Sequence, residues 1–239
     1  MANANFNSEV TKMLSQQFSI PVIAIDGPSA SGKGTVAQLV AEKLGFHYLD
    51  SGALYRLVAL AALNHQIAWS NESALVALAK TLHIQFKNNQ ILLNDADVSG
   101  LVRSEQIGRG ASEVAVHPAL RAQLLDCQHC FKRVPGLVAD GRDMATVVFK
   151  DADLKIFLTA DVMIRAERRH KQLLALNGAA DFHAILLDLK VRDERDSLRN
   201  AAPLKQASDA YLLNTDHLSI ADAVQQVLHW YKQLDQTVV

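Results

Sequence analysis

The stretch IPVIAIDGPSASGKGT, residues 20–35, decides the fold. Its apolar first half predicts a buried strand that ends at Asp26, and apolar residues from Val36 onward recur at helical spacing. A strand, a glycine-bounded turn and a helix start form a phosphate-binding loop, in which backbone N–H groups surround phosphate oxygens and a lysine adds positive charge. We therefore predict that a nucleotide phosphate chain binds to Gly27, Pro28, Ser29, Ala30, Ser31, Gly32, Lys33, Gly34 and Thr35.

The loop departs by one residue from the common pattern G-x-x-x-x-G-K-[ST]. Gly34 stands where a serine or threonine that binds Mg²⁺ is expected, and Thr35 follows it. The ending Lys33-Gly34-Thr35 resembles that of nucleoside monophosphate kinases more than that of GTPases. We predict ATP and Mg²⁺ as cofactors but no certain direct metal ligand; Thr35, or Asp140 through a water molecule, is the candidate.

Composition restricts the possible partners. The chain has 239 residues, about half of them apolar, and a net charge of −1, so it provides no field that would attract nucleic acid or a membrane surface. Its apolar runs are shorter than the ~18 residues of a membrane span, and residues 1–19 lack the layout of a signal peptide. We expect a cytoplasmic protein, a monomer, whose residues 1–19 form a frayed tail or a stray helix.

Strands and helices alternate along most of the chain. Further strands are predicted at 46–50, 136–140, 154–158 and 211–214, and helices at about 51–65, 161–176, 181–200 and 218–235. Five strands, each followed by a crossover, predict an α/β fold of three layers, in which helices cover both faces of a parallel sheet. Ser51 is expected to be the N-cap of the helix that follows the strand ending at Asp50.

Residues 64–116 interrupt this alternation. A helix at 71–81, a hairpin of strands 83–86 and 90–93 around Asn88-Asn89, a turn at 95–100 and a helix at 103–116 predict an inserted lobe, and a helix at 119–134 returns to the core. We expect a tail at 1–19 and a single domain at 20–239. Within that domain the core comprises 20–63 and 117–239, the insert about 64–116 and a lid about 161–200.

The residues after the strands carry the candidate chemistry. Ligands of such sheets bind beyond the carboxyl ends of the strands, so the phosphate loop, Ser51 and the segment 140–143 should share one cleft. There Asp140 could hold Mg²⁺ through water, Arg142 could bind a phosphate through two hydrogen bonds, and Asp143 could accept from an amino group. The alternative is a loop with an internal pair between Arg142 and Asp143.

Basic residues are concentrated between 161 and 200. Eight of the chain's 24 lysines and arginines fall there: Arg165, Arg168, Arg169, Lys171, Lys190, Arg192, Arg195 and Arg199. One interpretation is a solvated helix face; the other is stabilisation of the charge that phosphoryl transfer spreads over several oxygens. A break at Asn177-Gly178 between the two helices would suit a lid that closes over ATP.

Six segments together resemble the bacterial cytidylate kinases. They are GPSASGKGT at 27–35, LDSGALYR at 49–56, DVSGLVR at 97–103, ADGRDMATVVF at 139–149, KIFL at 155–158 and RDERDSLR at 192–199. The resemblance runs from about Ile20 to the C-terminus. It implies a P-loop fold with an enlarged insert that binds the nucleoside monophosphate and a short helical lid. The activity it implies is ATP-dependent phosphorylation of CMP and dCMP to CDP and dCDP.

The resemblance also implies residue roles. The residues expected to contact cytosine are Ser112, Arg121 and Asp143; those for the CMP phosphate are Ser51, Arg56 and Arg142; those for the sugar are Arg192 and Asp196. The residues expected to act on the transferred phosphate are Lys33, Arg142, Arg199 and the lid arginines Arg168 and Arg169. An aspartate can accept from the cytosine amino group, whereas uracil would present a carbonyl oxygen to it.

The chain departs from the family pattern in three places. Ala145 and Ala30 stand where glycine is frequent, and the stretch from Cys127 to Cys130 lies where the family more often has Gln-Arg. The two cysteines are expected to be ordinary thiols. Ala145 would stiffen the loop beside Arg142 if its φ had to be positive. Two other functions stay open: a kinase for a small metabolite such as shikimate or gluconate, and a nucleotide-regulated switch with slow turnover.

Overall fold

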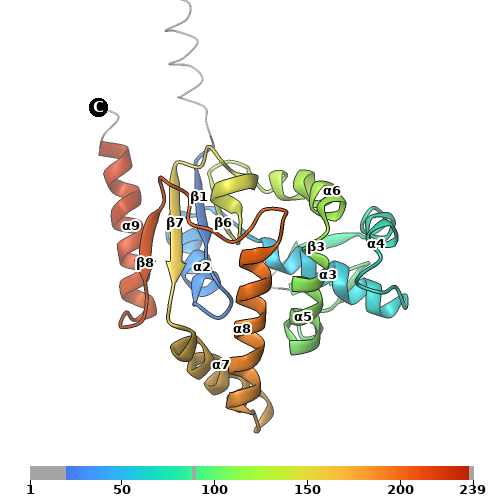
Figure 1. The fold of residues 1–239 in the computed structure, drawn as a ribbon. Coiled ribbons are helices and arrows are strands. Elements are labelled where there is room, and N and C mark those ends of the chain that lie inside the picture. The colour runs from blue at the N-terminus through green and yellow to red at the C-terminus, as the bar shows by residue number, and fades with distance from the viewer. Residues whose placement is uncertain (1–19, 88–89, 237–239) are drawn as a thin grey trace, which may run out of the picture.

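A five-stranded parallel sheet forms the centre of the protein, in the order β2-β6-β1-β7-β8 (Figure 1). The computed structural model describes residues 20–87 and 90–236. The strands are β1 (Val22–Asp26), β2 (His47–Asp50), β6 (Leu137–Gly141), β7 (Leu154–Thr159) and β8 (Tyr211–Asn214). Every neighbouring pair is parallel, which confirms the predicted fold class. The central position of β1 places the loop that follows it in the middle of the sheet's carboxyl edge.

Both faces of β1 are buried. Ile23 and Ile25 face a core shared with α2 (Lys33–Leu44) and α9 (Ile220–Gln236). Val22 and Ala24 face the opposite core, which includes α3 (Ser51–Asn64). A strand covered on both faces has no reason to alternate apolar and polar residues, which explains the continuous apolar run of the sequence.

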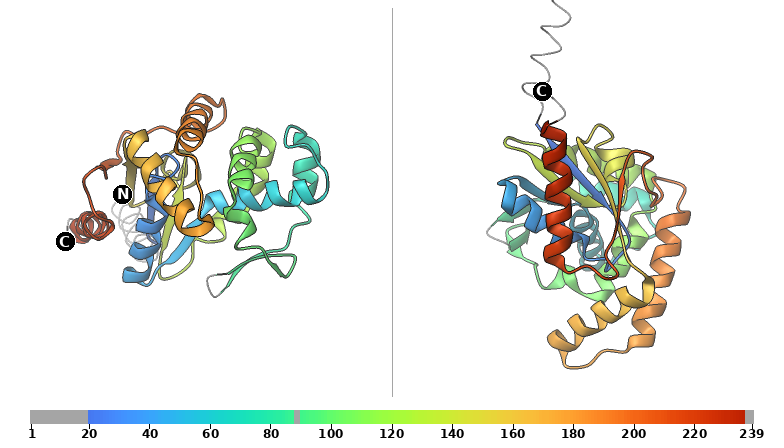
Figure 2. Two further views of the ribbon diagram at one scale, coloured as in Figure 1. Left: turned by 90° about the horizontal axis from the view of Figure 1, so that it is seen from below. Right: turned by 90° about the vertical axis from the view of Figure 1, so that its left-hand side faces the viewer.

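A second lobe lies beside α3 (Figures 1 and 2). It contains α4 (Glu72–Ala79), an antiparallel sheet, a short 3₁₀ helix (Leu101–Arg103) and α5 (Glu105–Val114), and α6 (Pro118–His129) follows. The sheet has the strands β3 (Ile84–Lys87), β4 (Gln90–Leu93) and β5 (Ala96–Asp97). Leu75, Val114 and Leu120 share one core with Val58 of α3, so the lobe is packed against the first helix after β2. The hairpin tip predicted at Asn88-Asn89 lies outside the described residues, as do residues 1–19.

Two consecutive helices, steeply inclined to each other, extend from the carboxyl edge of the sheet (Figure 2). They are α7 (Val162–Asn177) and α8 (Phe182–Leu198). Gly178 has a φ of 71° and ends α7, as expected for a glycine after a helix, and Asp181 caps α8. Ala166, Ile185 and Leu189 form a small core between the pair.

The structure corrects one local prediction and removes one concern. Asp50, not Ser51, is the N-cap of α3: it keeps an extended backbone, and its Oδ1 accepts from the Ala53 N–H at 3.0 Å, while Ser51 is the first helical residue. Ala145 lies in a π-helical turn, Met144–Val148, and is not among the residues with positive φ. Ala30 does have a left-handed backbone, with φ 59°.

Within the described residues, no helix combines the length and the apolar composition that crossing a membrane requires.

Gly27 should tolerate no side chain. A Cβ there would lie 1.9 Å from the Leu158 backbone oxygen, which cannot move without shifting β7. We expect Gly27→Ala to lower the free energy of unfolding by more than about 3 kcal/mol, because overpacking against backbone cannot relax. Gly45→Ala is the matched control: its φ is 67° but nothing lies within 4 Å, so only the left-handed backbone costs, about 1 kcal/mol. Equal losses in urea unfolding would contradict the steric explanation.

Candidate active site

A cleft of about 680 Å³ opens at the carboxyl edge of the sheet and is lined by residues of the phosphate loop, the second lobe and the α7–α8 pair. All the residues predicted for the site line it except two. Gly27 is packed under Leu158, and Pro28 accepts a hydrogen bond from the Ser31 hydroxyl through its carbonyl. The folded chain therefore gathers into one cavity segments that lie far apart in the sequence.

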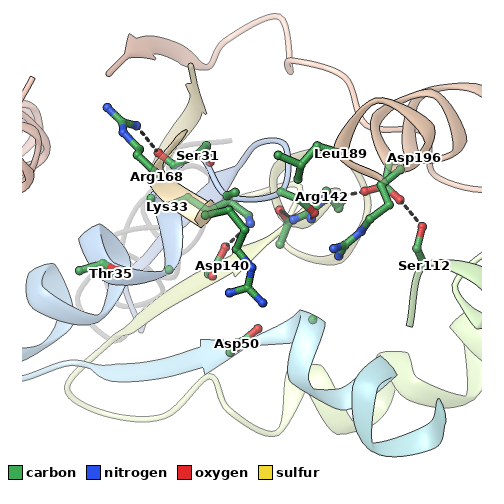
Figure 3. A pocket seen from close by; sticks show the side chains of 18 of the residues that line it. Ser31, Lys33, Thr35, Asp50, Ser112, Asp140, Arg142, Arg168, Leu189 and Asp196 are labelled. Atoms are coloured by element: carbon green, nitrogen blue, oxygen red, sulfur yellow. Dashed lines mark hydrogen bonds and ion pairs between the residues drawn. The ribbon is translucent and has the colours of Figure 1, made fainter. Parts of the chain in front are cut away.

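Lys33 and Asp140 face each other at the base of the cleft (Figure 3). Gly32, with φ 91°, turns the loop into α2, and Lys33 is the first residue of that helix. Lys33 Nζ lies 3.5 Å from Asp140 Oδ1, and both side chains are buried. Burial lowers the pKa of Lys33 and raises the pKa of Asp140 to about 6. Lys33 therefore adds its positive charge to that of the N-terminus of α2, where anions bind.

The same corner fits a magnesium ion held through water. A Cβ at Gly34 would lie 3.0 Å from Asp140 Oδ2, which gives a physical reason for glycine where the common motif has serine or threonine. Asp140 Oδ1 is buried and accepts no hydrogen bond from the described residues. Thr35 lies on α2, well to one side of Asp140 (Figure 3). The described residues contain no cluster of three metal-binding side chains, so water and phosphate oxygens would have to supply most ligands.

Arg142 connects the phosphate loop to the opposite wall of the cleft. Its Nη2 donates to Ser29 Oγ at 2.6 Å, and its Nε donates to Asp196 Oδ2 at 2.8 Å. Ser112 of α5 donates to the other oxygen of Asp196 at 3.2 Å (Figure 3). Burial acts to lower the pKa of Arg142, but the charge of Asp196 outweighs it and the pKa is raised. The guanidinium of Arg142 is thus a fixed positive charge between the phosphate loop, α8 and α5.

Asp143 is held by arginines from two other segments. Arg121 of α6 donates to Asp143 Oδ2 and stacks over the Tyr55 ring, 5.5 Å from its centroid. Arg199 Nη2 lies 3.9 Å from Asp143 Oδ1. The alternative interpretation of the sequence, an internal pair between Arg142 and Asp143, is therefore wrong: adjacent residues point to different walls of the cleft and take different partners.

Positive charge without full compensation collects near Arg56 and Arg192. Arg56 Nη1 donates to the Val102 carbonyl at 2.7 Å, and both its terminal nitrogens would lie 3.3 Å from a Cβ at Gly108. Arg192 Nη1 lies 3.7 Å from Asp188 Oδ2, and the buried Nε of Arg192 has no hydrogen-bond partner among the described residues. Burial first, then neighbouring arginines, lower the pKa of Arg56 to about 10 and also lower that of Arg192. Such a spot favours an anion.

The two arginines expected in the lid have different partners. Arg168 donates to the Ser31 carbonyl of the phosphate loop at 3.4 Å and to the Thr215 carbonyl at 2.5 Å. Arg169 forms an ion pair with Glu105, the first residue of α5. Arg168 therefore joins α7 to the phosphate loop, and Arg169 joins α7 to the second lobe.

Sequence reasoning missed three residues of the site. Arg165 was noted only within the basic run; it is buried, pairs with Asp193 at 2.5 Å and donates to the Ser29 carbonyl at 3.0 Å. For Arg165 the interpretation as a solvated helix face is wrong. Thr215 follows β8 and donates to the Ser31 carbonyl at 3.3 Å. The signal for Thr215 was its place directly after a strand of the sheet.

The third missed residue is Asp26, at the end of β1. It is 1% exposed, and its two oxygens accept from the backbone N–H groups of Met144 and Ala145, each at 2.8 Å. Burial raises its pKa to about 7 against the effect of these two hydrogen bonds, and the acids Asp143 and Asp140 add to the rise. The available signal for Asp26 was its position as an acid at the end of an apolar run, a position that Asp50 and Asp140 also have.

A parallel α/β sheet, a phosphate loop at its central strand and an arginine-lined cleft define the class: a P-loop phosphotransferase. The cytidylate kinase family model matches residues 23–233, and the chain belongs to that family.

Curated relatives agree with this assignment. Proteins named cytidylate kinase from Paraburkholderia phymatum and Polynucleobacter asymbioticus are 57% and 58% identical over 214 residues. These matches cover 90% of this chain, and 94% and 97% of the relatives. A further one, from Burkholderia multivorans, is 56% identical over 216 residues, which cover 90% of this chain and 95% of the relative.

Asp26→Asn should change how stability depends on pH. The raised pKa of about 7, against 3.8 for an ordinary aspartate, means that the folded state binds more protons than the unfolded state between these values. The free energy of unfolding of the wild type should therefore fall as pH rises, on the order of 1.4 kcal/mol per pH unit, and level off above about pH 7. The variant lacks this contribution. Urea unfolding of the wild type and the variant at several pH values tests this prediction. If the free energies of unfolding of the two proteins depend on pH in the same way, the Asp26 carboxyl is already ionised at about pH 4 and the prediction is wrong.

Proposed function

We infer that this chain catalyses ATP-dependent phosphorylation of CMP and dCMP to CDP and dCDP. The observation that carries the inference is the position of Arg142, whose guanidinium spans from Ser29 of the phosphate loop to Asp196 of α8. A cation at that point can contact both the donor phosphates and the acceptor phosphate, which must approach each other for direct transfer. Membership of the cytidylate kinase family supports the choice of acceptor.

The reaction needs positioning and charge more than acid–base groups. An oxygen of the acceptor phosphate forms a bond to the γ-phosphorus of ATP, the bond from that phosphorus to the β–γ bridging oxygen breaks, and ADP leaves. The attacking phosphate monoester is already largely ionised at neutral pH, so no strong general base is required. We propose that Lys33, Arg142 and Arg199 stabilise the negative charge of the transferred phosphoryl group. Arg168 and Arg169 of α7 would join them when the lid closes.

The base-reading set is buried and polar. Ser112 and Asp143 are 7% and 3% exposed, and Arg121 forms an ion pair with Asp143. We propose that Asp143 accepts from the cytosine amino group while Ser112 and Arg121 donate to the ring nitrogen and carbonyl. Uracil would place a carbonyl oxygen against a carboxylate, so two acceptors would face each other and the uracil oxygen would lack a donor.

The remaining acceptor contacts follow from the charges. We assign the CMP phosphate to Ser51, Arg56 and Arg142, and the sugar to Arg192 and Asp196. Burial and neighbouring arginines lower the pKa of Arg56 and of Arg192, which supports an anionic ligand beside them.

Mg²⁺ would be held by Asp140 through water, with Thr35 as the second candidate, and would supply charge neutralisation on the β- and γ-phosphates. Asp140 Oδ1 supports this choice, because it is buried and accepts no hydrogen bond from the described residues, with the Lys33 ammonium 3.5 Å away. We further propose that residues 64–116 act as the monophosphate-binding insert and 161–200 as a lid that excludes water. It stays a prediction that the enzyme is monomeric and cytoplasmic and that it binds neither nucleic acid nor membranes.

Acceptor specificity tests the function. ADP release should be measured with Mg²⁺-ATP and each of CMP, dCMP, UMP, AMP and GMP, and also with shikimate and gluconate. We expect rapid turnover with CMP and dCMP and at least about tenfold lower kcat/KM with UMP, because an unpaired buried polar group costs roughly 1–3 kcal/mol. Equal turnover of UMP would contradict the role of Asp143 but keep the kinase. Activity only with shikimate or gluconate, or no acceptor-dependent ADP release, would favour the metabolite kinase or the switch.

Lys33→Ala should lower kcat by about 100-fold or more, because it removes a positive charge aimed at the transferred group. The matched control is Lys155→Ala on β7, whose ammonium pairs with Asp209 at 2.7 Å outside the cleft. The control should keep kcat within about twofold of the wild type. Stopped-flow or coupled-assay kinetics of both variants decides the point, and near-normal turnover of the Lys33 variant would overturn the assignment.

A further inference from the structure

Asp26 lies where two functional segments meet. It is the last residue of β1 and immediately precedes Gly27, the first residue of the phosphate loop. Its carboxylate accepts from the N–H groups of Met144 and Ala145, the first two residues of the π-helical turn after Asp143. One buried side chain therefore joins the start of the donor loop to the segment that presents the residues of the acceptor side.

The turn requires two acceptors from this position. Met144 and Ala145 are 0% and 4% exposed, so water cannot replace a lost partner unless the turn moves. A carboxylate offers both oxygens. Asparagine would turn a donor toward one N–H, and serine would reach only one of them. A buried acid beside Asp140 and Asp143 is unfavourable by itself. The need of the two N–H groups for acceptors explains why an acid nevertheless stands at this position.

The two segments depend on this carboxylate to different extents. The phosphate loop has other anchors: Arg165 donates to its Ser29 carbonyl, and Thr215 donates to its Ser31 carbonyl. In the turn, the N–H groups of the later residues Val147 and Val148 both donate to the carbonyl of residue 143, so these bonds are internal. Loss of the carboxylate should thus displace the turn while the loop keeps its place.

We propose that Asp26 is a positioning residue for the acceptor nucleotide. It touches no substrate; it holds the backbone from which Arg142 and Asp143 project, and thereby sets their distance from the phosphate loop. The inference rests on the proposed function, since it concerns how CMP is bound and distinguished from UMP.

The test compares Asp26→Asn and Asp26→Ser with Asp153→Asn. Asp153 is the matched control, because its carboxylate also accepts from a backbone N–H of β1, that of Val22 at 2.7 Å, but at the end of the strand opposite the cleft. For Asp26→Asn we expect KM for CMP to rise about tenfold or more and the CMP-to-UMP ratio of kcat/KM to fall by a similar factor, since small displacements of a site are costly. KM for ATP should stay within about twofold, and the Ser variant should lie between.

The outcomes separate positioning from a purely structural role. A variant that melts earlier but keeps the wild-type KM for CMP and the wild-type base selectivity would overturn the proposal, as would equal rises of KM for CMP and ATP. Failure of both Asp26 variants to fold would assign the carboxylate to folding and also reject it. Wild-type protein without CMP turnover would instead refute the proposed function, which the same assays reveal before any variant is compared.

Discussion

Buried guanidinium groups impose the constraint on which the cleft depends. A charge withdrawn from water is tolerated only where acceptors surround it, and here the chain itself supplies those acceptors. The principal pairs are Arg142 with Asp196, Arg121 with Asp143, and Arg165 with Asp193. Each pair joins separate elements, so these guanidinium groups hold the walls of the cleft together.

Two further ion pairs join the α7–α8 pair to the second lobe. Arg169 and Glu105 connect α7 to α5, and Arg109 of α5 lies 3.7 Å from Asp188 of α8. These contacts are partly exposed, and exposed ion pairs are weak and easily exchanged. A phosphate chain bound beside Arg169 would compete with Glu105 for its guanidinium, and would so link occupancy of the cleft to the arrangement of the helical pair.

Much of the fold was predictable because apolar patterning is local. The run before Asp26 required burial on both faces, and glycine at position 178 ended a helix where its left-handed backbone is needed. The N-cap of α3 was misassigned by one residue, since Asp50 and Ser51 both have capping side chains and only the backbone conformation decides between them. Arg165 was missed because its partner, Asp193, lies on another helix.

By itself the sequence determined the class of the sheet, the phosphate loop and, through segments resembling a family, the residues that should meet in the cleft. The pairing of these residues was decided only by the tertiary structure. Arg142 and Asp143 are neighbours in the chain but turn to different walls, and Asp26 reaches a turn more than a hundred residues away. Local patterns record which residues are buried, whereas partners depend on how strand ends converge at one edge of the sheet.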